Sequence, residues 1–320
     1  MTTTNILTRR HFLQQVAASG LVCWNLPRLS AETEIKAVVT FGFTLYGMRK
    51  LPLADAFKVC GDIGYDSVEL VCMADWPCAP ESLSKPARTE LTQQLIDNHL
   101  SVSSLMENLS PLAEEKIHVL NLERLRRTCE LGHDLSPRST PVIETVLGGK
   151  PAEWDQVRKR MADRLQDWAK IAEAGKTIIA LKPHVGGALH TPEGAKWLKD
   201  QLPSPWLKLA YDFSHFELQA IPMEESLKQM LAETAFVHLK DSQGTASKFQ
   251  FLLPGDGCTD YREYFRLLKK LGYHGPLVIE VSGQLHSRPD YDAAIAAKRC
   301  FANLAPLLAE SGLWKPRGKQ

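Results

Sequence analysis

The chain has 320 residues, with 38 Lys and Arg against 37 Asp and Glu and a formal net charge of +1. This length suits one large α/β barrel or two smaller domains, and the balanced charge disfavours a nucleic-acid-binding protein and an acidic disordered tail. The hydrophobic fraction of 44% is ordinary for a globular enzyme. After removal of a leader, no apolar run reaches the roughly 18 residues of a membrane span.

The N-terminal segment 1–31 resembles a twin-arginine export signal, so we do not expect it to be part of the folded domain. Arg9 and Arg10 precede a weakly apolar stretch at 16–24, and a small-residue cleavage-like site follows at 29–31. The competing interpretation is a chance Arg-Arg pair in an amphipathic start. We expect a leader, the twin-arginine machinery as a partner, and a periplasmic or other extracytoplasmic location.

Apolar, β-branched runs alternate with helical patterns along residues 35–312. The expected strands are 38–43, 67–72, 101–106, 141–147, 177–181, 207–211, 235–239 and 277–281. The expected helices are 52–63, 87–98, 112–131, 152–174, 191–201, 223–232, 260–271 and 291–308. Residues between 239 and 260 are expected to form a loop, and Gly175 is expected at the C′ position of the fourth helix.

Eight strand–helix units without a linker-like break predict one α/β domain, a (β/α)8 TIM barrel at 35–312, with a short C-terminal tail at 313–320. A doubly wound open sheet is the alternative. Such a sheet usually has a Gly-rich phosphate loop after its first strand, and residues 44–48 show no such fingerprint.

Ligand-type side chains follow successive predicted strands in the second half of the chain. Asp212, His238 and Glu280 end the sixth, seventh and eighth strands. The C-terminal ends of barrel strands carry the chemistry of this architecture, so the three side chains are expected to converge. Two carboxylates and an imidazole suit Mn²⁺, Zn²⁺, Co²⁺ or Fe²⁺ better than Ca²⁺. The sequence therefore predicts a divalent metal as cofactor.

The same segments resemble the xylose isomerase-like superfamily of sugar phosphate isomerases and epimerases. The resemblance rests on residues 211–215, 237–241, 253–257 and 271–280, where order, spacing and residue types agree with the family pattern. It implies that Asp212, His238 and Glu280 bind the metal. It also implies that His215, three residues after the aspartate, lines the substrate site.

Lys182 departs from that pattern, because the family has a metal-binding Glu at the end of the fifth strand. In the family epimerases, the strand-five and strand-eight carboxylates also act as a pair of bases on opposite faces of a sugar carbon. Strand alternation places Lys182 and His184 on one face. Three alternatives follow. Lys182 is a catalytic acid or base with a lowered pKa, or it holds a substrate anion or hydroxyl while His184 helps to bind the metal. The third alternative is that the metal site is lost.

Several further residues are candidates for substrate contact. Glu144 lies near the end of the fourth strand, and Lys240 flanks the predicted site beside His238. Trp76 lies in a loop of the active face, where its ring can stack on a sugar. Salt bridges or helix caps compete as the explanation of Glu144, and ordinary packing competes as that of Trp76.

The leading hypothesis is an exported sugar isomerase or epimerase that uses a divalent metal to enolise a keto- or aldo-sugar. Lys182 breaks the carboxylate pair, so a metal-assisted lyase or dehydratase acting on a keto-sugar or keto-glycoside is the runner-up. A non-catalytic carbohydrate-binding barrel is the alternative from another class. A small carbohydrate is the expected ligand in each case, and a homo-oligomer is one option for the assembly.

Overall fold

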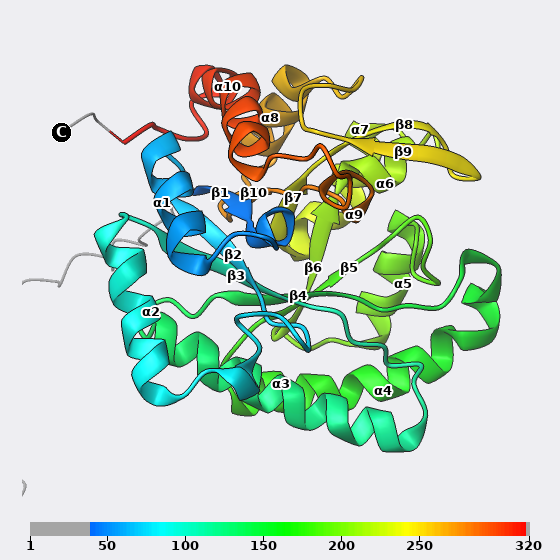
Figure 1. Ribbon diagram of the computed structural model, residues 1–320. Coiled ribbons are helices and arrows are strands. Elements are labelled where there is room, and N and C mark those ends of the chain that lie inside the picture. The colour runs from blue at the N-terminus through cyan, green and yellow to red at the C-terminus, as the bar shows by residue number, and fades with distance from the viewer. Residues whose placement is uncertain (1–38, 318–320) are drawn as a thin grey trace, which may run out of the picture. The chain divides into compact units, whose positions relative to one another are not determined.

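The computed structural model describes residues 39–317, so the predicted leader at 1–31 and the last three residues of the chain lie outside the described residues. Eight parallel strands close into a barrel in the order β1-β10-β7-β6-β5-β4-β3-β2, and helices lie between them in the chain (Figure 1). The predicted (β/α)8 TIM barrel is therefore confirmed, and the open-sheet alternative is wrong.

The observed elements lie close to the predicted ranges. The barrel strands are β1 (Phe41–Thr44), β2 (Ser67–Val71), β3 (Ser101–Glu107), β4 (Val142–Val146), β5 (Ile179–Lys182), β6 (Leu207–Asp212), β7 (Thr234–Leu239) and β10 (Leu277–Ile279). The helices are α1 (Leu53–Ile63), α2 (Lys85–Asp97), α3 (Glu115–Leu135), α4 (Trp154–Ala174), α5 (Pro192–Gln201), α6 (Phe213–Glu217), α7 (Met223–Met230), α8 (Tyr261–Lys270), α9 (Gly283–His286) and α10 (Ala293–Ser311).

A small apolar layer closes the barrel interior beneath the strand ends of its second half. It consists of Ala180, Ala210, Phe236 and Val278. Two positions further along the same strands stand Lys182, Asp212, His238 and Glu280. Side chains two residues apart in a strand point to the same face. The polar residues therefore stand directly above this layer, at the C-terminal end of the barrel.

Capping side chains fix where several helices begin. The Thr191 hydroxyl accepts a hydrogen bond from Gly194 N at the start of α5, which also has Pro192 in its first turn. Asp260 and Asp292 accept from backbone N–H groups in the same way at the starts of α8 and α10. Such caps satisfy backbone donors that lack a partner inside the helix, which sharpens these boundaries.

A hairpin replaces the loop that was predicted between residues 239 and 260. Its strands are β8 (Asp241–Thr245) and β9 (Lys248–Leu252), which pair antiparallel and project from the end of the barrel (Figure 1). The two residues between them are Ala246 and Ser247, which lack the Asn-Gly or Asp-Gly signature of a tight hairpin turn. This missing signature explains why the hairpin was not predicted.

Gly175 ends α4 as expected, but it is the C-cap residue with right-handed backbone angles (φ −81°, ψ −3°), and not a C′ residue. Lys176 takes the left-handed conformation instead (φ +46°). The glycine is needed for close packing, because a Cβ atom there would lie 2.9 Å from Cys129 Sγ. The predicted C′ role of Gly175 is therefore wrong.

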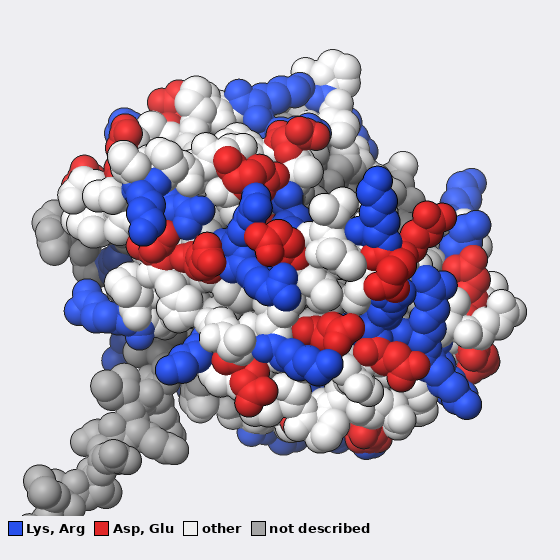
Figure 2. Space-filling view, turned by 90° about the horizontal axis from the view of Figure 1, so that it is seen from below, with Lys and Arg blue, Asp and Glu red and all other residues white. Residues whose placement is uncertain are grey.

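Within residues 39–317, none of the helices combines the length and the apolar composition that crossing a bilayer requires. Basic and acidic side chains are interspersed on the face of the molecule that Figure 2 shows. At the C-terminal end, Trp314 is buried and packs edge-on against Phe41, with ring centroids 5.6 Å apart. The first residues of the predicted tail therefore belong to the packed body of the barrel.

Candidate active site

A cavity of about 350 Å³ opens at the C-terminal ends of the barrel strands. Among its lining residues are four that the sequence analysis singled out: Glu144, Lys182, His184 and Glu280. This volume falls at the small end of the usual range for ligand pockets. The cavity is therefore a site for a small molecule.

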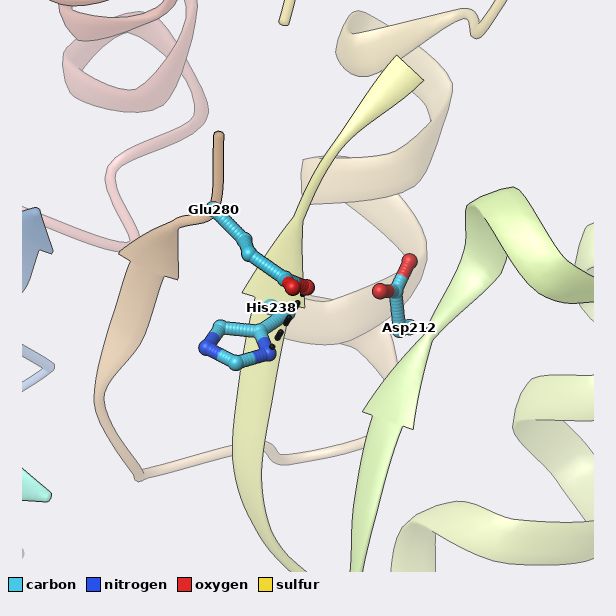
Figure 3. A group of neighbouring side chains, drawn as sticks. All are labelled: Asp212, His238 and Glu280. Carbon is cyan, nitrogen blue, oxygen red and sulfur yellow. Dashed lines mark ion pairs between the residues drawn. The ribbon is translucent and has the colours of Figure 1, made fainter. Parts of the chain in front are cut away.

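Asp212, His238 and Glu280 point toward one another from the ends of β6, β7 and β10 (Figure 3). One ligand-type atom from each lies within 4.8 Å of the other two. His238 Nδ1 and Glu280 Oε2 are 3.2 Å apart. Asp212 and His238 are fully buried, whereas Glu280 is 7% exposed and reaches the cavity wall. The sequence-predicted trio is therefore brought together, with Glu280 as its member facing the cavity.

The ring of His238 is oriented by a carboxylate from the opposite half of the barrel. Its Nε2 lies 3.0 Å from Glu69 Oε2, and Ser104 Oγ donates to the other oxygen of Glu69 at 2.9 Å. Glu69 accepts a hydrogen bond from Nε2–H, which leaves Nδ1 facing Lys182 and Glu280. Burial and Lys182 lower the pKa of His238, but the carboxylates of Glu69 and Glu280 outweigh them and raise this pKa above its ordinary value. A carboxylate behind the imidazole is the usual arrangement for a metal-binding histidine.

Lys182 lies at the centre of this group. Its Nζ is 2.9 Å from His238 Nδ1, 3.1 Å from Glu144 Oε1 and 3.3 Å from Glu280 Oε2. Burial by itself lowers the pKa of Lys182, but the carboxylates of Glu144 and Glu280 outweigh it and raise this pKa above its ordinary value. The predicted lowered pKa is therefore wrong for this arrangement, in which Lys182 is an ammonium group.

Lys240 forms a second ammonium contact with the same carboxylates. Its Nζ lies 2.9 Å from both Asp212 Oδ2 and Glu280 Oε2, and 3.3 Å from His215 Nε2. Burial alone raises the pKa of a carboxylic acid, but Lys182 and Lys240 hold the pKa of Glu280 below its usual value, and chiefly Lys240 does the same for Asp212. Lys240 and His215 lie behind the carboxylates and not in the wall of the cavity.

The donor set fits a divalent metal ion. Two carboxylates and an imidazole nitrogen within reach of one another suit a first-row metal. Among residues 39–317, no donor forms a well-directed hydrogen bond with Asp212 Oδ2, although Lys240 Nζ lies close to it. The ammonium groups of Lys182 and Lys240 contact atoms that would face the ion, so a bound cation has to displace them.

His184 lines the cavity but lies outside the group of three metal-type ligands. Its Nδ1 accepts a hydrogen bond from Gly186 N at 3.0 Å. Burial, together with His215 and Lys240, lowers the pKa of His184 to about 2. The ring is therefore neutral, with its proton on Nε2, and provides one hydrogen-bond donor.

The remaining predicted substrate contacts, Glu144 and Trp76, differ in their position relative to the cavity. Glu144 lines the cavity, and burial raises its pKa despite the opposing charge of Lys182. Trp76 lies instead behind Tyr46, whose ring it stacks on at a centroid distance of 5.3 Å, while the Arg49 guanidinium lies 4.7 Å from the Trp76 ring. Tyr46 and not Trp76 lines the cavity, so the predicted stacking of Trp76 on a sugar is wrong.

Other parts of the wall were missed in the sequence. Glycines at 148–149 and 186–187, with Met73 and Met106, line the cavity, and only the Gly-Gly pairs give a sequence signal. Outside the wall, the missed hairpin places the ring of Phe251 4.3 Å from Lys240 Nζ. Asp241 accepts hydrogen bonds from two backbone N–H groups of the following loop, at 2.7 and 2.9 Å. It therefore orders that loop.

The comparison with protein families agrees with this architecture. Residues 57–302 match the family model described as "Xylose isomerase-like TIM barrel". This range covers strands β2 to β10 and the residues of the candidate site apart from Tyr46, which precedes it. The predicted leader at 1–31 lies outside the match.

Individual relatives are distant. L-ribulose-5-phosphate 3-epimerase UlaE of Escherichia coli is 22% identical over 257 residues, which cover 78% of this chain and 89% of the relative. The crystal structure of 3-keto-D-glucoside 4-epimerase YcjR from E. coli superposes with a TM-score of 0.66 at 17% identity, covering 84% of this chain and 99% of the other. The IOLI protein with a bound zinc atom gives a TM-score of 0.72 at 20% identity, with 85% and 99% covered.

Proposed function

Because the chain belongs to the xylose isomerase-like TIM barrel family, we propose that it is a sugar isomerase or epimerase that enolises a keto- or aldo-sugar with the help of a divalent metal. The observation that carries the proposal is the convergence of Asp212, His238 and Glu280 beside a small cavity. The epimerase names of two relatives and the zinc in a structural neighbour support it.

The metal would be held by Asp212, His238 and Glu280. Such an ion would supply Lewis-acid chemistry, which would make a hydrogen next to the sugar carbonyl easier to remove. Glu69 orients the imidazole of His238 from behind. Ser214 holds the Asp212 carboxylate through its N–H and its hydroxyl, at 3.1 and 2.6 Å from Oδ1.

Glu280 is the base of the proposed reaction. The two lysines keep its pKa low, so the carboxylate is ionised, and it lines the cavity. Lys182 is a proton donor and hydrogen-bond donor toward an oxygen that becomes negative, because its ammonium group faces the same cavity. His184 adds a neutral donor beside Lys182.

One observation favours a second candidate, a lyase or dehydratase. Lys182 stands where the family pattern has a carboxylate, so a symmetric pair of bases on opposite faces of the sugar is lost. Elimination needs one base and one acid, and Glu280 with the Lys182 ammonium, 3.3 Å apart, provide such a pair. In this reaction Glu280 takes the α-proton while Lys182 protonates the leaving hydroxyl or alkoxide.

Export is a separate part of the proposal and rests on residues 1–31 alone. The adjacent Arg9 and Arg10 followed by an apolar stretch support a twin-arginine route to a periplasmic or extracytoplasmic location. Changing both arginines to lysine should leave the full-length protein in the cytoplasm of a host with this pathway. Unchanged export of that variant would contradict the proposed route.

Solvent exchange tests the enzyme proposal. Metal-loaded protein is incubated in D₂O with a panel of ketoses and aldoses, and products are followed by NMR. We expect deuterium at the carbon next to the carbonyl, its loss in Asp212→Asn, and its retention in the surface control Asp290→Asn. Deuterated stereoisomers indicate epimerisation, and dehydrated products indicate elimination. Sugar binding without exchange would overturn the enzyme proposal in favour of a carbohydrate-binding barrel.

A further inference from the structure

Ionisable side chains in the cavity wall are mostly acidic. Glu107, Glu144 and Glu280 line the cavity, and Lys182 is the only lysine or arginine that does so among residues 39–317. A phosphate ester carries a charge of about −1.5 to −2 at neutral pH and is usually recognised by arginine or lysine. The wall therefore offers a phosphate one cation, which is shared with two of these carboxylates.

The single ammonium group in the wall is engaged with buried acceptors. Lys182 Nζ hydrogen-bonds His238 Nδ1 and Glu280 Oε2, at 2.9 and 3.3 Å, and lies 3.1 Å from Glu144 Oε1. Lys240 is engaged in the same way with Asp212 and Glu280, behind the wall. A phosphate that drew either ammonium toward itself would leave a buried carboxylate without its partner, which is costly.

Two cations of an adjoining surface cavity are also paired. Met73, Glu107 and Asn108 are shared with an adjoining surface cavity that includes Arg124 and Arg127. Arg124 Nε bonds both oxygens of Glu107, and Arg127 Nε bonds Glu123 at 3.1 Å. These guanidinium groups therefore already neutralise carboxylates.

The rest of the wall is neutral. Tyr46, Met73, Met106 and Leu147 give it apolar and aromatic surface, and Gly148 and Gly149 give it backbone. Both glycines have left-handed φ values, of +72° and +73°, and a Cβ atom at Gly149 would lie 2.8 Å from Ala188 Cβ. Close packing thus explains these glycines without a phosphate ligand.

We infer that the cavity takes an uncharged monosaccharide-sized keto- or aldo-sugar, or a short glycoside of one, and discriminates against sugar phosphates. The inference rests on the proposed function and names its substrate class. The lack of an unpaired cation in the wall supplies the discrimination, because a phosphate there would lose its hydration without gaining a free charged partner. The hydroxyl groups of an uncharged sugar carry no charge and can bond to Glu144 without this penalty.

Matched pairs of ligands test the inference. Binding of D-ribulose and D-ribulose 5-phosphate, and of D-tagatose and D-tagatose 6-phosphate, is measured by calorimetry with metal-loaded wild-type protein. We expect each free sugar to bind at least tenfold more tightly than its phosphate. Equal or tighter binding of the phosphates, or binding of neither member of any pair, would overturn the inference.

A charge-adding variant tests the physical reason. Asn108 is exposed at the cavity rim, so Asn108→Arg adds a cation there, and Asn108→Gln is the neutral control. We expect Asn108→Arg to lower the ratio of the Kd of the phosphate to the Kd of the free sugar by at least threefold. Asn108→Gln should leave this ratio unchanged. An unaltered preference in Asn108→Arg would overturn the electrostatic explanation.

Hydrogen exchange in the same samples separates this inference from the proposed function. Exchange confined to phosphorylated sugars would overturn the substrate class and leave the enolising function in place. Preferential binding of free sugars without exchange of any α-hydrogen would support the substrate class and overturn the enolising function.

Discussion

Two buried glutamates at strand ends, Glu107 of β3 and Glu280 after β10, show how one side-chain type serves two purposes. Both oxygens of Glu107 are saturated: Arg124 Nε bonds them at 3.0 and 2.9 Å, and Thr128 Oγ1 donates to Oε1 at 2.9 Å. The contacts of Glu280 with Lys182 and Lys240 fall on Oε2 alone. Within the described part of the chain, Oε1 of Glu280 has no such partner and is left for the cavity.

The pKa values of the two carboxyl groups are shifted in opposite directions, in agreement with these contacts. Burial raises the pKa of Glu107 to about 7 despite its bonds with Arg124, whereas two ammonium groups outweigh burial at Glu280 and lower its pKa. A carboxylate bonded on both oxygens by neighbouring helix residues holds the structure together. A carboxylate whose partners gather on one oxygen keeps the other for a ligand or a proton.

The largest effect is expected from Glu280→Gln. The change removes the proposed base and one metal-type ligand while keeping the size of the side chain, so turnover should fall by roughly 10²- to 10⁴-fold. Rates of α-hydrogen exchange with the best sugar of the panel measure this loss. Glu107→Gln is the matched control and should retain far more turnover. Comparable losses in the two variants would break the distinction between the two glutamates.

For stability we expect the reverse order: Glu107→Gln should lower the free energy of unfolding more than Glu280→Gln does. Glu107→Gln leaves the partly buried Arg124 with only the more exposed Glu81 as its carboxylate partner, which should reduce the free energy of unfolding by about 1–3 kcal/mol. Urea denaturation at pH 8 measures the difference. The double variant Glu107→Gln/Arg124→Met should recover part of the loss, because it removes the charge of Arg124 as well. A single variant as stable as the wild type would contradict a structural role for this pair.

Lys182→Glu sharpens the comparison from the other side of the site. The variant restores the carboxylate of the family pattern and removes an ammonium group that contacts two metal-facing atoms. Affinity for Mn²⁺ or Zn²⁺, measured by calorimetry, should rise by about tenfold or more, since affinity grows with ligand charge. Native turnover should fall if Lys182 donates the proton. The exposed Lys248→Glu is the control, and an equal gain there would show a general charge effect.

The smallest effect is a dependence of stability on pH. Burial, with His215 and Lys240, lowers the pKa of folded His184 to about 2, whereas an unfolded histidine has a pKa of about 6.5. Protonation therefore favours the unfolded chain, so this contribution is full above pH 6.5 and is lost as pH falls toward 2. The free energy of unfolding should drop by about 1 kcal/mol per pH unit below 6.5.

His184→Gln should flatten this slope between pH 6.5 and 4.5 in urea denaturation, relative to the wild type. The exposed His274→Gln is the matched control and should keep the wild-type slope. A slope that is the same in both variants and in the wild type would mean that His184 is not held neutral by the fold.

The sequence predicts the barrel because its strands are nearly continuous apolar runs followed by amphipathic helices, and these patterns are local. Asp212, His238 and Glu280 follow from the same logic, since parallel strand ends meet at one edge. The contact of Glu69 with His238 joins residues 169 positions apart, and no local pattern encodes it. The hairpin β8–β9 was not predicted because Ala246 and Ser247 carry no turn signal.

Two side-chain predictions failed for a shared reason. The pKa of Lys182 depends on how many carboxylates surround it, and the accessibility of Trp76 depends on Tyr46 lying in front of it. Both are properties of three-dimensional neighbours and not of strand position. Sequence patterns therefore identify which residues reach the site, whereas the contacts between them decide the role of each.

Metal content is the most direct test of the central claim that Asp212, His238 and Glu280 form a divalent metal centre. Elemental analysis of protein purified without chelator is compared between the wild type, Asp212→Ala and the control Glu107→Gln. The account predicts about one equivalent of a transition metal per chain in the wild type and the control, and its loss in Asp212→Ala. A wild-type protein that binds no metal even after reconstitution, or an Asp212→Ala variant that binds it fully, would contradict the account.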